Sequence, residues 1–346
     1  MIKITRDAHL LPHNTFGMDV KASVLAEYDT VDELCQLLAN PDITALMEQN
    51  RQLGRLPFWH IGSGSNLLFR GDYQGVVLHC TATGIEPTSQ GETCLLEVKA
   101  GTIWDDVCAY CSQHALYGAE NLSLIPGETG AAAVQNIGAY GVEMKDIVEQ
   151  VVCWDVQAGC EHRLSAREMQ YGYRQSLLKQ AEAKSRYIVT SVILRLHHTP
   201  QLHLEYAGLK QAIESAEPSA QEVRDAVIRI RQGKLPDPRE LGNAGSFFKN
   251  PVVPNSVFES LLLTYPTMPH YVVDDRHTKI PAGWLIEQCG WKGKSLGRAG
   301  VYQKQSLVLV NLGGATPQEI ITLCDTVRYD VKAKFGIDIE PEVNII

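Results

Sequence analysis

The segment LGNAGSFFKNP, residues 241–251, places Ser246 between two small residues and two phenylalanines. The glycines and asparagine before the serine allow a sharp backbone turn, which can carry a hydroxyl group close to a reacting atom. A nucleophilic serine usually stands in a GxSxG turn and relies on a histidine, and neither accompanies Ser246. A nucleophile is therefore disfavoured, and the residues leave open an acid or a simple turn residue.

Two glycine-rich loops could bind a phosphate group. Residues 61–69, IGSGSNLLF, follow a short apolar run, but they lack both the Rossmann glycine spacing and the Walker A lysine. A tight β-turn is the stronger interpretation of this loop alone. Residues 125–144, IPGETGAAAVQNIGAYGVEM, have so few large side chains that the backbone can approach a flat polar ligand. Together the loops suggest a pyrophosphate held between two subdomains.

The charge balance restricts the partners of the chain. It has 346 residues with a formal net charge of −9, and it contains no long run of lysine and arginine. This balance disfavours nucleic acid as the main partner. A small anionic ligand would have to meet a local group of basic residues, and the candidates for such a group are Lys234, Lys249, Lys292 and Lys294.

The elements that must position these residues are indicated by local signals. Capping boxes predict helices that begin at Thr30, Ser219 and Thr316, each of which is followed three residues later by a glutamate. We expect Gly233 and Gly336 to end the last two of these helices.

Strand-like runs gather in the first 200 residues and do not alternate regularly with helices, which favours an α+β fold over a doubly wound parallel sheet. Five of these runs, FWHIG, GVVLHC, CLLEVKAG, IVEQVVCWDV and RYIVTSVILRL, lie in the first 200 residues, and a sixth, LVLVNLGG, lies at 307–314.

Nine scattered cysteines, an odd number, favour a reduced cytosolic protein. The close pair Cys108 and Cys111 shares a helical stripe with Trp104 and Val107, which indicates a buried helix face. His114 could complete a metal site there, but the core stripe is the favoured interpretation, and we expect no metal site. The N-terminus has no apolar segment typical of a secretion signal, and no apolar run is long enough to span a membrane.

With these motifs assembled, the chain resembles a known family. The blocks GSGSN, IPGETGAAAVQNIGAYG, YGYRQSLLK, KLPDP, GNAGSFFKNP, AGWLIEQCGWKG and PEV occur in the order seen in the MurB-type UDP-N-acetylenolpyruvoylglucosamine reductases. The similarity runs from about residue 14 to the end of the chain. The short match around Tyr206 in LEYAGL is similar to the tyrosine-loop subgroup of that family.

The resemblance implies a fold of the vanillyl-alcohol-oxidase (PCMH) type, with two α+β subdomains that hold non-covalent FAD and a third α+β domain that binds substrate. It implies FAD-binding subdomains at residues 1–83 and 84–235, a substrate-binding domain at 236–335 and a C-terminal segment at 336–346 that returns to the active site. We therefore expect a cytoplasmic monomer that binds neither membrane nor nucleic acid.

The implied reaction, a step of bacterial cell-wall synthesis, reduces UDP-N-acetylglucosamine enolpyruvate to UDP-N-acetylmuramate. NADPH reduces FAD, and flavin N5 then passes the hydride to C3 of the enolpyruvyl group. By resemblance Ser246 donates a proton to C2 and Arg174 grips the substrate carboxylate. Glu342, four residues from the C-terminus, either helps Arg174 to stabilise the enolate or organises the proton donor.

The resemblance also implies the binding residues. Those expected to contact FAD are Gly62, Ser63, Gly64, Ser65, Asn66, Pro126, Gly127, Gly130, Ala131, Gln135, Asn136, Gly138, Ala139, Tyr140 and Gly141. Those expected to contact the UDP-sugar are Tyr206, Lys234, Asn250, Gln288 and Lys292. Tyr206 would close over the substrate as a lid.

Three other functions remain as alternatives. One is an oxidase of the same fold, although neither glycine loop holds the histidine or cysteine to which such enzymes often bind flavin covalently. The second is a UDP-sugar sensor without flavin, and the third is a serine hydrolase built on Ser246. The colour of the purified protein and its response to NADPH distinguish them.

Overall fold

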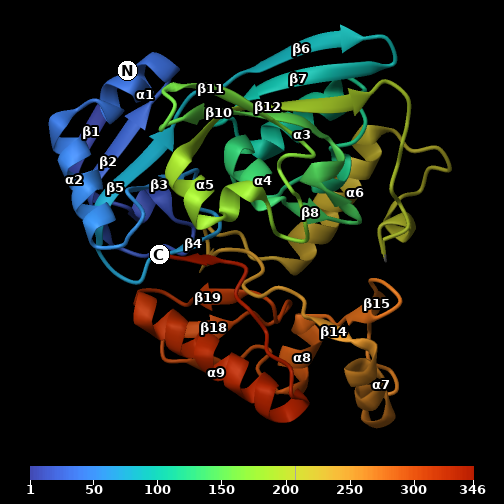
Figure 1. Cartoon of the computed structure of the whole chain (residues 1–346). Helices are drawn as coiled ribbons and strands as arrows, with labels where there is room; N and C mark the ends of the chain where they lie inside the picture. The colour runs from blue at the N-terminus through green and yellow to red at the C-terminus, as the bar shows by residue number, and fades with distance from the viewer. Residues whose placement is uncertain (207) are drawn as a thin grey trace. The chain divides into compact units, whose positions relative to one another are not determined.

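The computed structural model describes residues 1–206 and 208–346 (Figure 1). The chain forms two compact units and passes between them several times. Unit 1 consists of Met1–His9, Lys21–Ser63 and Tyr73–Gly233. Unit 2 consists of Leu10–Val20, Gly64–Asp72 and Lys234–Ile346. Each unit therefore builds its core from segments that are far apart in the sequence.

The first sheet of unit 1 has four strands in the order β1-β2-β5-β3, with β1 antiparallel to β2 and the other neighbours parallel. Its strands are β1 (Lys3–His9), β2 (Lys21–Tyr28), β3 (Phe58–Ile61) and β5 (Tyr73–Cys80), and helices α1 (Val31–Leu38) and α2 (Pro41–Gln52) connect β2 to β3. The predicted start of α1 is confirmed, because the Thr30 hydroxyl accepts the Glu33 N–H at 3.2 Å. This sheet presents the end of β3 to the first glycine loop.

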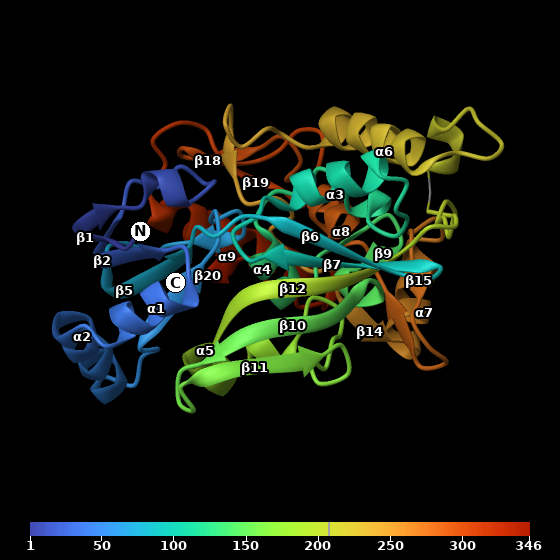
Figure 2. The ribbon, with the colours of Figure 1, turned by 90° about the horizontal axis from the view of Figure 1, so that it is seen from above.

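The second sheet of unit 1 is antiparallel, in the order β11-β10-β12-β7-β6 (Figures 1 and 2). Its strands are β6 (Ile85–Gln90), β7 (Thr93–Lys99), β10 (Val148–Asp155), β11 (Cys160–Ser165) and β12 (Tyr187–His197). Branched apolar residues fill β10 and β12, which suits strands whose side chains are largely buried. The strands predicted from FWHIG, GVVLHC, CLLEVKAG, IVEQVVCWDV and RYIVTSVILRL are confirmed.

Helices and a short hairpin complete unit 1. They are α3 (Trp104–Gln113), α4 (Thr129–Gln135), α5 (Ala181–Arg186), α6 (Ala220–Lys234), β8 (Gly138–Ala139) and β9 (Val142–Glu143), with 3-10 turns η2 (Glu120–Leu122), η3 (Met144–Asp146), η4 (Leu177–Lys179) and η5 (Lys210–Ala212). The predicted stripe on α3 is buried as expected, with both cysteines in the core. His114 instead stacks on the Tyr110 ring with centroids 4.0 Å apart.

The expectation that Gly233 ends its helix is wrong. Helix α6 continues through Gly233 to Lys234, and Gly233 does not adopt the left-handed φ of a terminating glycine. Pro236 follows two residues later and cannot continue a helix, so it accounts for the end. Gly336, by contrast, closes α9 with φ of 69°, as expected.

Unit 2 holds an antiparallel sheet in the order β13-β19-β18-β17, packed against α9 (Figure 1). These elements are β13 (Gly242–Asn243), β17 (Ser295–Leu296), β18 (Ala299–Val301), β19 (Leu309–Asn311) and α9 (Pro317–Phe335). Helix α9 begins at the predicted capping box of Thr316 and Glu319, and α8 (Ala282–Gln288) packs against it. The run LVLVNLGG forms only the three residues of β19.

Two smaller sheets finish unit 2. One joins β14 (Val252–Pro254), β16 (His277–Lys279) and β15 (Tyr271–Val272) beside α7 (Asn255–Thr264), and the other pairs β4 (Leu67–Leu68) with β20 (Asn344–Ile345) in parallel. The 3-10 turn η1 (Leu11–His13) belongs to the same unit. Among residues 1–206 and 208–346, no helix combines the length and apolarity needed to cross a membrane.

Candidate active site

Ser246 sits on a tight turn that is anchored on both sides. Gly245 has φ of 69°, a conformation that favours glycine, and its N–H donates to Asn243 Oδ1 at 2.9 Å. Phe247 is fully buried, and its N–H donates to the Leu307 carbonyl at 2.7 Å. Phe248 is buried as well, so the core of unit 2 holds the chain directly after the half-buried serine.

The C-terminal segment lies directly alongside this turn. The N–H of Glu342 donates to the Phe247 carbonyl at 2.7 Å, and Phe248 and Pro341 form an isolated antiparallel bridge. The Asn66 side-chain amide donates to the Glu342 carbonyl at 3.5 Å. Unit 2 therefore brings Ser246, Glu342 and Asn66 together from three segments that are far apart in the sequence.

Arg174 belongs to unit 1, where it holds the second glycine loop. Its guanidinium donates to the Asn136 carbonyl at 3.1 Å and to the Gly138 carbonyl at 2.8 Å. Arg174 has φ of 54°, in the left-handed region that residues with a side chain seldom adopt, whereas Asn136 ends α4 with φ of 49°, which asparagine adopts readily at helix ends. Such strain often accompanies functional sites, because the surrounding structure must maintain it.

Lys179 is a site residue that the sequence interpretation missed. Its ammonium group donates to the Arg174 carbonyl at 2.9 Å and to Gln135 Oε1 at 2.7 Å. It therefore ties the strained arginine to the predicted cofactor residue Gln135. The sequence signal for Lys179 was its position at the end of the block YGYRQSLLK, five residues after Arg174.

Tyr206 lies beside the second loop, 44% exposed, and its ring meets the Tyr140 ring edge-on with centroids 5.6 Å apart. The buried Asn121 side chain donates to the carbonyls of Tyr140 and His203, at 2.8 and 2.7 Å. Asn121, another residue missed from the sequence, thus links the loop to the chain that leads to Tyr206. These contacts place the predicted lid residue next to the loop expected to hold the cofactor.

The predicted substrate residues of unit 2 are spread along α8. The Asn250 side-chain oxygen accepts the Ala282 N–H at 2.9 Å, so Asn250 lies at the start of this helix. Gln288 ends the helix, and the exposed Lys292 pairs with Glu287 at 2.9 Å. The contacts within unit 2 therefore hold Asn250 at one end of α8 and the other two residues at the opposite end. Lys234 is the exposed last residue of α6.

The first glycine loop follows β3, and its glycines lie close to neighbouring segments of the chain. A Cβ on Gly62 would lie 3.0 Å from Glu128 Oε2 and 3.3 Å from the Ala131 Cβ. Gly64 has φ of 72°, and a side chain there would collide with the His13 carbonyl. The boundary between the units falls inside this loop, with Gly62 and Ser63 in unit 1 and residues 64–66 in unit 2.

The second loop supplies the remaining predicted cofactor residues, all in unit 1. Pro126 and Gly127 precede α4, Gly130, Ala131 and Gln135 lie within it, Gly138 and Ala139 form β8, and Tyr140 and Gly141 make the turn to β9. The Gly130 N–H already donates to the Ala100 carbonyl at 2.9 Å, so this amide pins α4 to the chain beside it. Gln135 Nε2, in contrast, is a buried donor with no hydrogen-bond partner among the described residues. Closely packed glycines and a buried spare donor fit a polar cofactor such as FAD.

The comparisons first define the class of the protein. An FAD binding domain model matches residues 41–165, which include both glycine loops, 61–69 and 125–144. A crystal structure of the UDP-N-acetylenolpyruvylglucosamine reductase from Thermus caldophilus superposes over 100% of this chain and 99% of its own, with a TM-score of 0.68 and 23% identity. The chain is thus an α+β flavoprotein with that fold.

The sequence comparisons then identify the family. The C-terminal domain model of UDP-N-acetylenolpyruvoylglucosamine reductase matches residues 237–346. A reductase of that name from Bacteroides fragilis is 49% identical over 97% of this chain and 98% of its own length. One from Porphyromonas gingivalis is 41% identical over 99% of both chains. The chain belongs to the UDP-N-acetylenolpyruvoylglucosamine reductase family and is an oxidoreductase.

Proposed function

We propose that the chain catalyses the NADPH-dependent reduction of UDP-N-acetylglucosamine enolpyruvate to UDP-N-acetylmuramate, a step of peptidoglycan synthesis. The observation that carries this proposal is the arrangement of Ser246, Glu342 and Asn66 on adjoining segments of unit 2. It joins the predicted proton donor and carboxylate to the loop expected to hold FAD. The names of the relatives supply the substrate class.

FAD, when bound, supplies the transfer of hydride from NADPH to the terminal carbon of the enolpyruvyl group. Gly62, Gln135 and the second loop are the residues of unit 1 proposed to hold it, and the spare Gln135 Nε2 donor supports that assignment. The N–H of Gly130 is committed to Ala100, so the proposed contact at Gly130 is one of close packing.

The chain's own residues then control charge and protonation at the substrate. Addition at C3 places negative charge on the conjugated carboxylate, which Arg174 and Glu342 are proposed to stabilise. The Ser246 O–H bond breaks as its proton passes to C2 and forms the new C–H bond. The firm anchoring of the Ser246 turn supports this role, because a weak acid must be held at close range.

Substrate binding is assigned to Tyr206, Lys234, Asn250, Gln288 and Lys292. We place the substrate-binding domain at residues 236–335, followed by the C-terminal segment 336–346. The match of the family's C-terminal domain from residue 237 supports its beginning. The contact between the Tyr206 and Tyr140 rings supports a lid beside the cofactor loop.

The experiment that tests this function follows NADPH consumption by the purified protein with and without UDP-N-acetylglucosamine enolpyruvate, in the absence of oxygen. We expect consumption only when the sugar nucleotide is present, and a product heavier by two hydrogens in the mass spectrum. Consumption that requires air and ignores the sugar nucleotide would instead indicate an oxidase. Binding of the sugar nucleotide without any turnover would indicate a sensor.

A further inference from the structure

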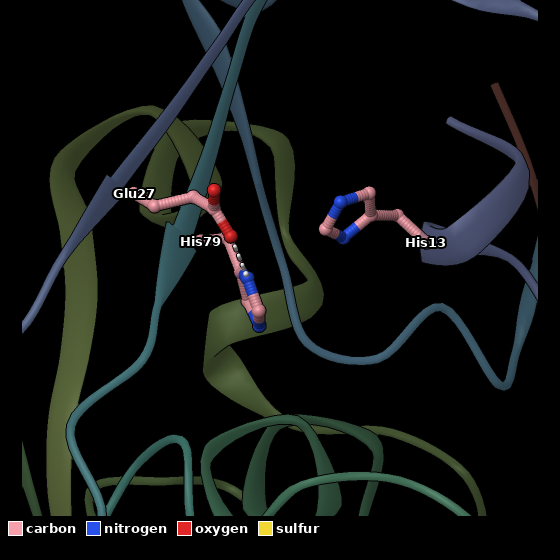
Figure 3. Close-up of side chains that lie close together, drawn as sticks. All are labelled: His13, Glu27 and His79. Carbon is pink, nitrogen blue, oxygen red and sulfur yellow. Dashed lines mark hydrogen bonds and ion pairs between the residues drawn. The ribbon is translucent and has the colours of Figure 1, made fainter. Parts of the chain in front are cut away.

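Four charged side chains form a line through unit 1 toward the glycine loops. Lys3 on β1 donates to Glu27 on β2 at 2.7 Å. Glu27 Oε1 lies 3.4 Å from Nδ1 of His79 on β5, and Figure 3 shows the carboxylate directed at the ring. The other ring nitrogen of His79, Nε2, lies 3.1 Å from Glu128 Oε1. The line therefore ends at Glu128, the residue before α4 in the second glycine loop.

The geometry at His79 favours a protonated ring. A carboxylate only accepts hydrogen bonds, and a neutral imidazole has only one N–H to donate. His79 has a carboxylate oxygen near each nitrogen, at 3.4 and 3.1 Å, and a ring protonated on both nitrogens satisfies both contacts. Burial opposes the charged ring, but the hydrogen bonds and charges of Glu128 and Glu27 outweigh it and raise the pKa of His79. His60 on the adjacent β3 stays neutral, because burial lowers its pKa to about 3.

Glu128 lies beside both loops that are proposed to bind the pyrophosphate of FAD. Its carboxylate approaches Gly62 of the first loop, since a Cβ there would lie 3.0 Å from Oε2. Glu128 itself is part of the second loop, and its side chain is only 8% exposed. Both loops are proposed to line the pyrophosphate of FAD, which is an anion. A carboxylate without a balancing positive charge at this position would repel that anion.

The protonation of His79 sets the net charge of the group of four side chains. With a protonated His79, the cluster of Lys3, Glu27, His79 and Glu128 has two positive and two negative charges and is neutral. Without that proton the cluster carries one net negative charge next to Gly62. The ring also connects two elements, because it holds Glu128 to β2 and β5 by hydrogen bonds on both sides.

We propose that His79 is a positioning residue for FAD: its imidazolium neutralises Glu128 and holds that carboxylate against Gly62, so that the loops can accept the pyrophosphate. The proposal rests on the proposed FAD site but extends to residues outside the assigned cofactor contacts. It concerns the affinity for FAD and does not depend on the proposed proton transfer from Ser246.

The test is a titration of flavin-free protein with FAD, followed by the quenching of flavin fluorescence. His79→Gln leaves Glu128 charged and unbalanced, and we expect the dissociation constant of FAD to rise about tenfold or more. The double variant His79→Gln with Glu128→Gln removes both charges, and its affinity should return to within about threefold of the unmodified protein. His277→Gln is the matched control, because His277 pairs with Asp274 at 3.0 Å on the exposed surface of unit 2. This control should bind FAD normally.

The pH dependence gives a second readout. Above the ordinary imidazole pKa of about 6.5, the raised pKa of His79 keeps the ring charged, and further alkali then removes its proton. FAD affinity of the unmodified protein should therefore fall as the pH rises through that pKa. Glu128→Gln should bind FAD at least as tightly as the unmodified protein, and its affinity should no longer fall with rising pH. This variant tests the proposal even if His79→Gln does not fold.

Two results separate this inference from the proposed function. If the unmodified protein binds no FAD at any pH, the proposed function fails and this inference fails with it. If the unmodified protein binds FAD, but His79→Gln binds it equally well or Glu128→Gln binds it more weakly, only the role of His79 is overturned.

Discussion

At the scale of single residues, Ser246 is a very weak acid in water, and its proposed role depends on position. Its turn is fixed by the Asn243 side chain before it and by the buried Phe247 after it. Such anchoring reduces the reorganisation needed when charge develops on the substrate. The Glu342 N–H donates to the Phe247 carbonyl of the same turn, so one backbone contact fixes the segments that carry Ser246 and Glu342.

Ser246→Ala should separate the two halves of the reaction. We expect flavin reduction by NADPH to stay within about twofold, because the serine takes no part in that hydride transfer. Reoxidation by the enolpyruvyl substrate should slow by about 10³-fold or more, which is about 4 kcal/mol of barrier. Anaerobic stopped-flow absorbance measures both rates. Equal reoxidation in both proteins would show that Ser246 is not the acid.

Lys234→Ala tests the binding of the substrate anion. Loss of a charge-assisted contact should raise the apparent KM for the sugar nucleotide about tenfold and change kcat little. Lys332→Ala is the control, since Lys332 pairs with Asp338 on an exposed surface. If the KM of both variants equals that of the unmodified protein, Lys234 does not contact the substrate.

At the scale of elements, the turn between β10 and β11 depends on one buried carboxylate. Asp155 accepts two hydrogen bonds from Arg186 and one each from the N–H groups of Gln157 and Ala158. The bonds from Arg186 are the main cause that lowers the pKa of Asp155 to about 2, against 3.8 for a free side chain. A depressed carboxyl pKa stabilises the fold above the unfolded value and loses that contribution as the pH falls through the folded value.

Asp155→Asn should therefore lower the free energy of unfolding by about 2 kcal/mol at pH 7. The difference between the variant and the unmodified protein should shrink as the pH falls from about 4 toward 2. Urea unfolding followed by circular dichroism at several pH values measures it. A difference that stays constant down to the lowest pH would exclude the ionised Asp155 as its source.

The same scale shows which features the sequence can predict. The capping boxes at Thr30 and Thr316 and the buried stripe of α3 involve residues within one or two turns, and these predictions are confirmed. The prediction for Gly233 was wrong because glycine tolerates a helical backbone. Helix α6 ends at Lys234, and Pro236 accounts for that end. The contacts of Lys179 with Gln135 and of His79 with Glu128 bridge more than 40 residues each, so local patterns cannot reveal them.

At the scale of the whole molecule, the α+β class and the family were predictable because long sequence blocks carry them, and the comparisons confirm both. The division of the chain between the units was not predictable from these blocks. Residues 10–20 and 64–72 join unit 2 although their neighbours on either side belong to unit 1. The first glycine loop is therefore divided between the two units, and this division depends on the tertiary fold and not on local sequence patterns.

The visible spectrum of the purified protein, before and after NADPH and then substrate, tests the central claim most directly. We predict a yellow protein with flavin absorbance that is bleached by NADPH without oxygen. The colour should return rapidly when UDP-N-acetylglucosamine enolpyruvate is added, and much more slowly in air. A colourless protein, or a bleached one that air reoxidises as fast as the sugar nucleotide does, would contradict the account.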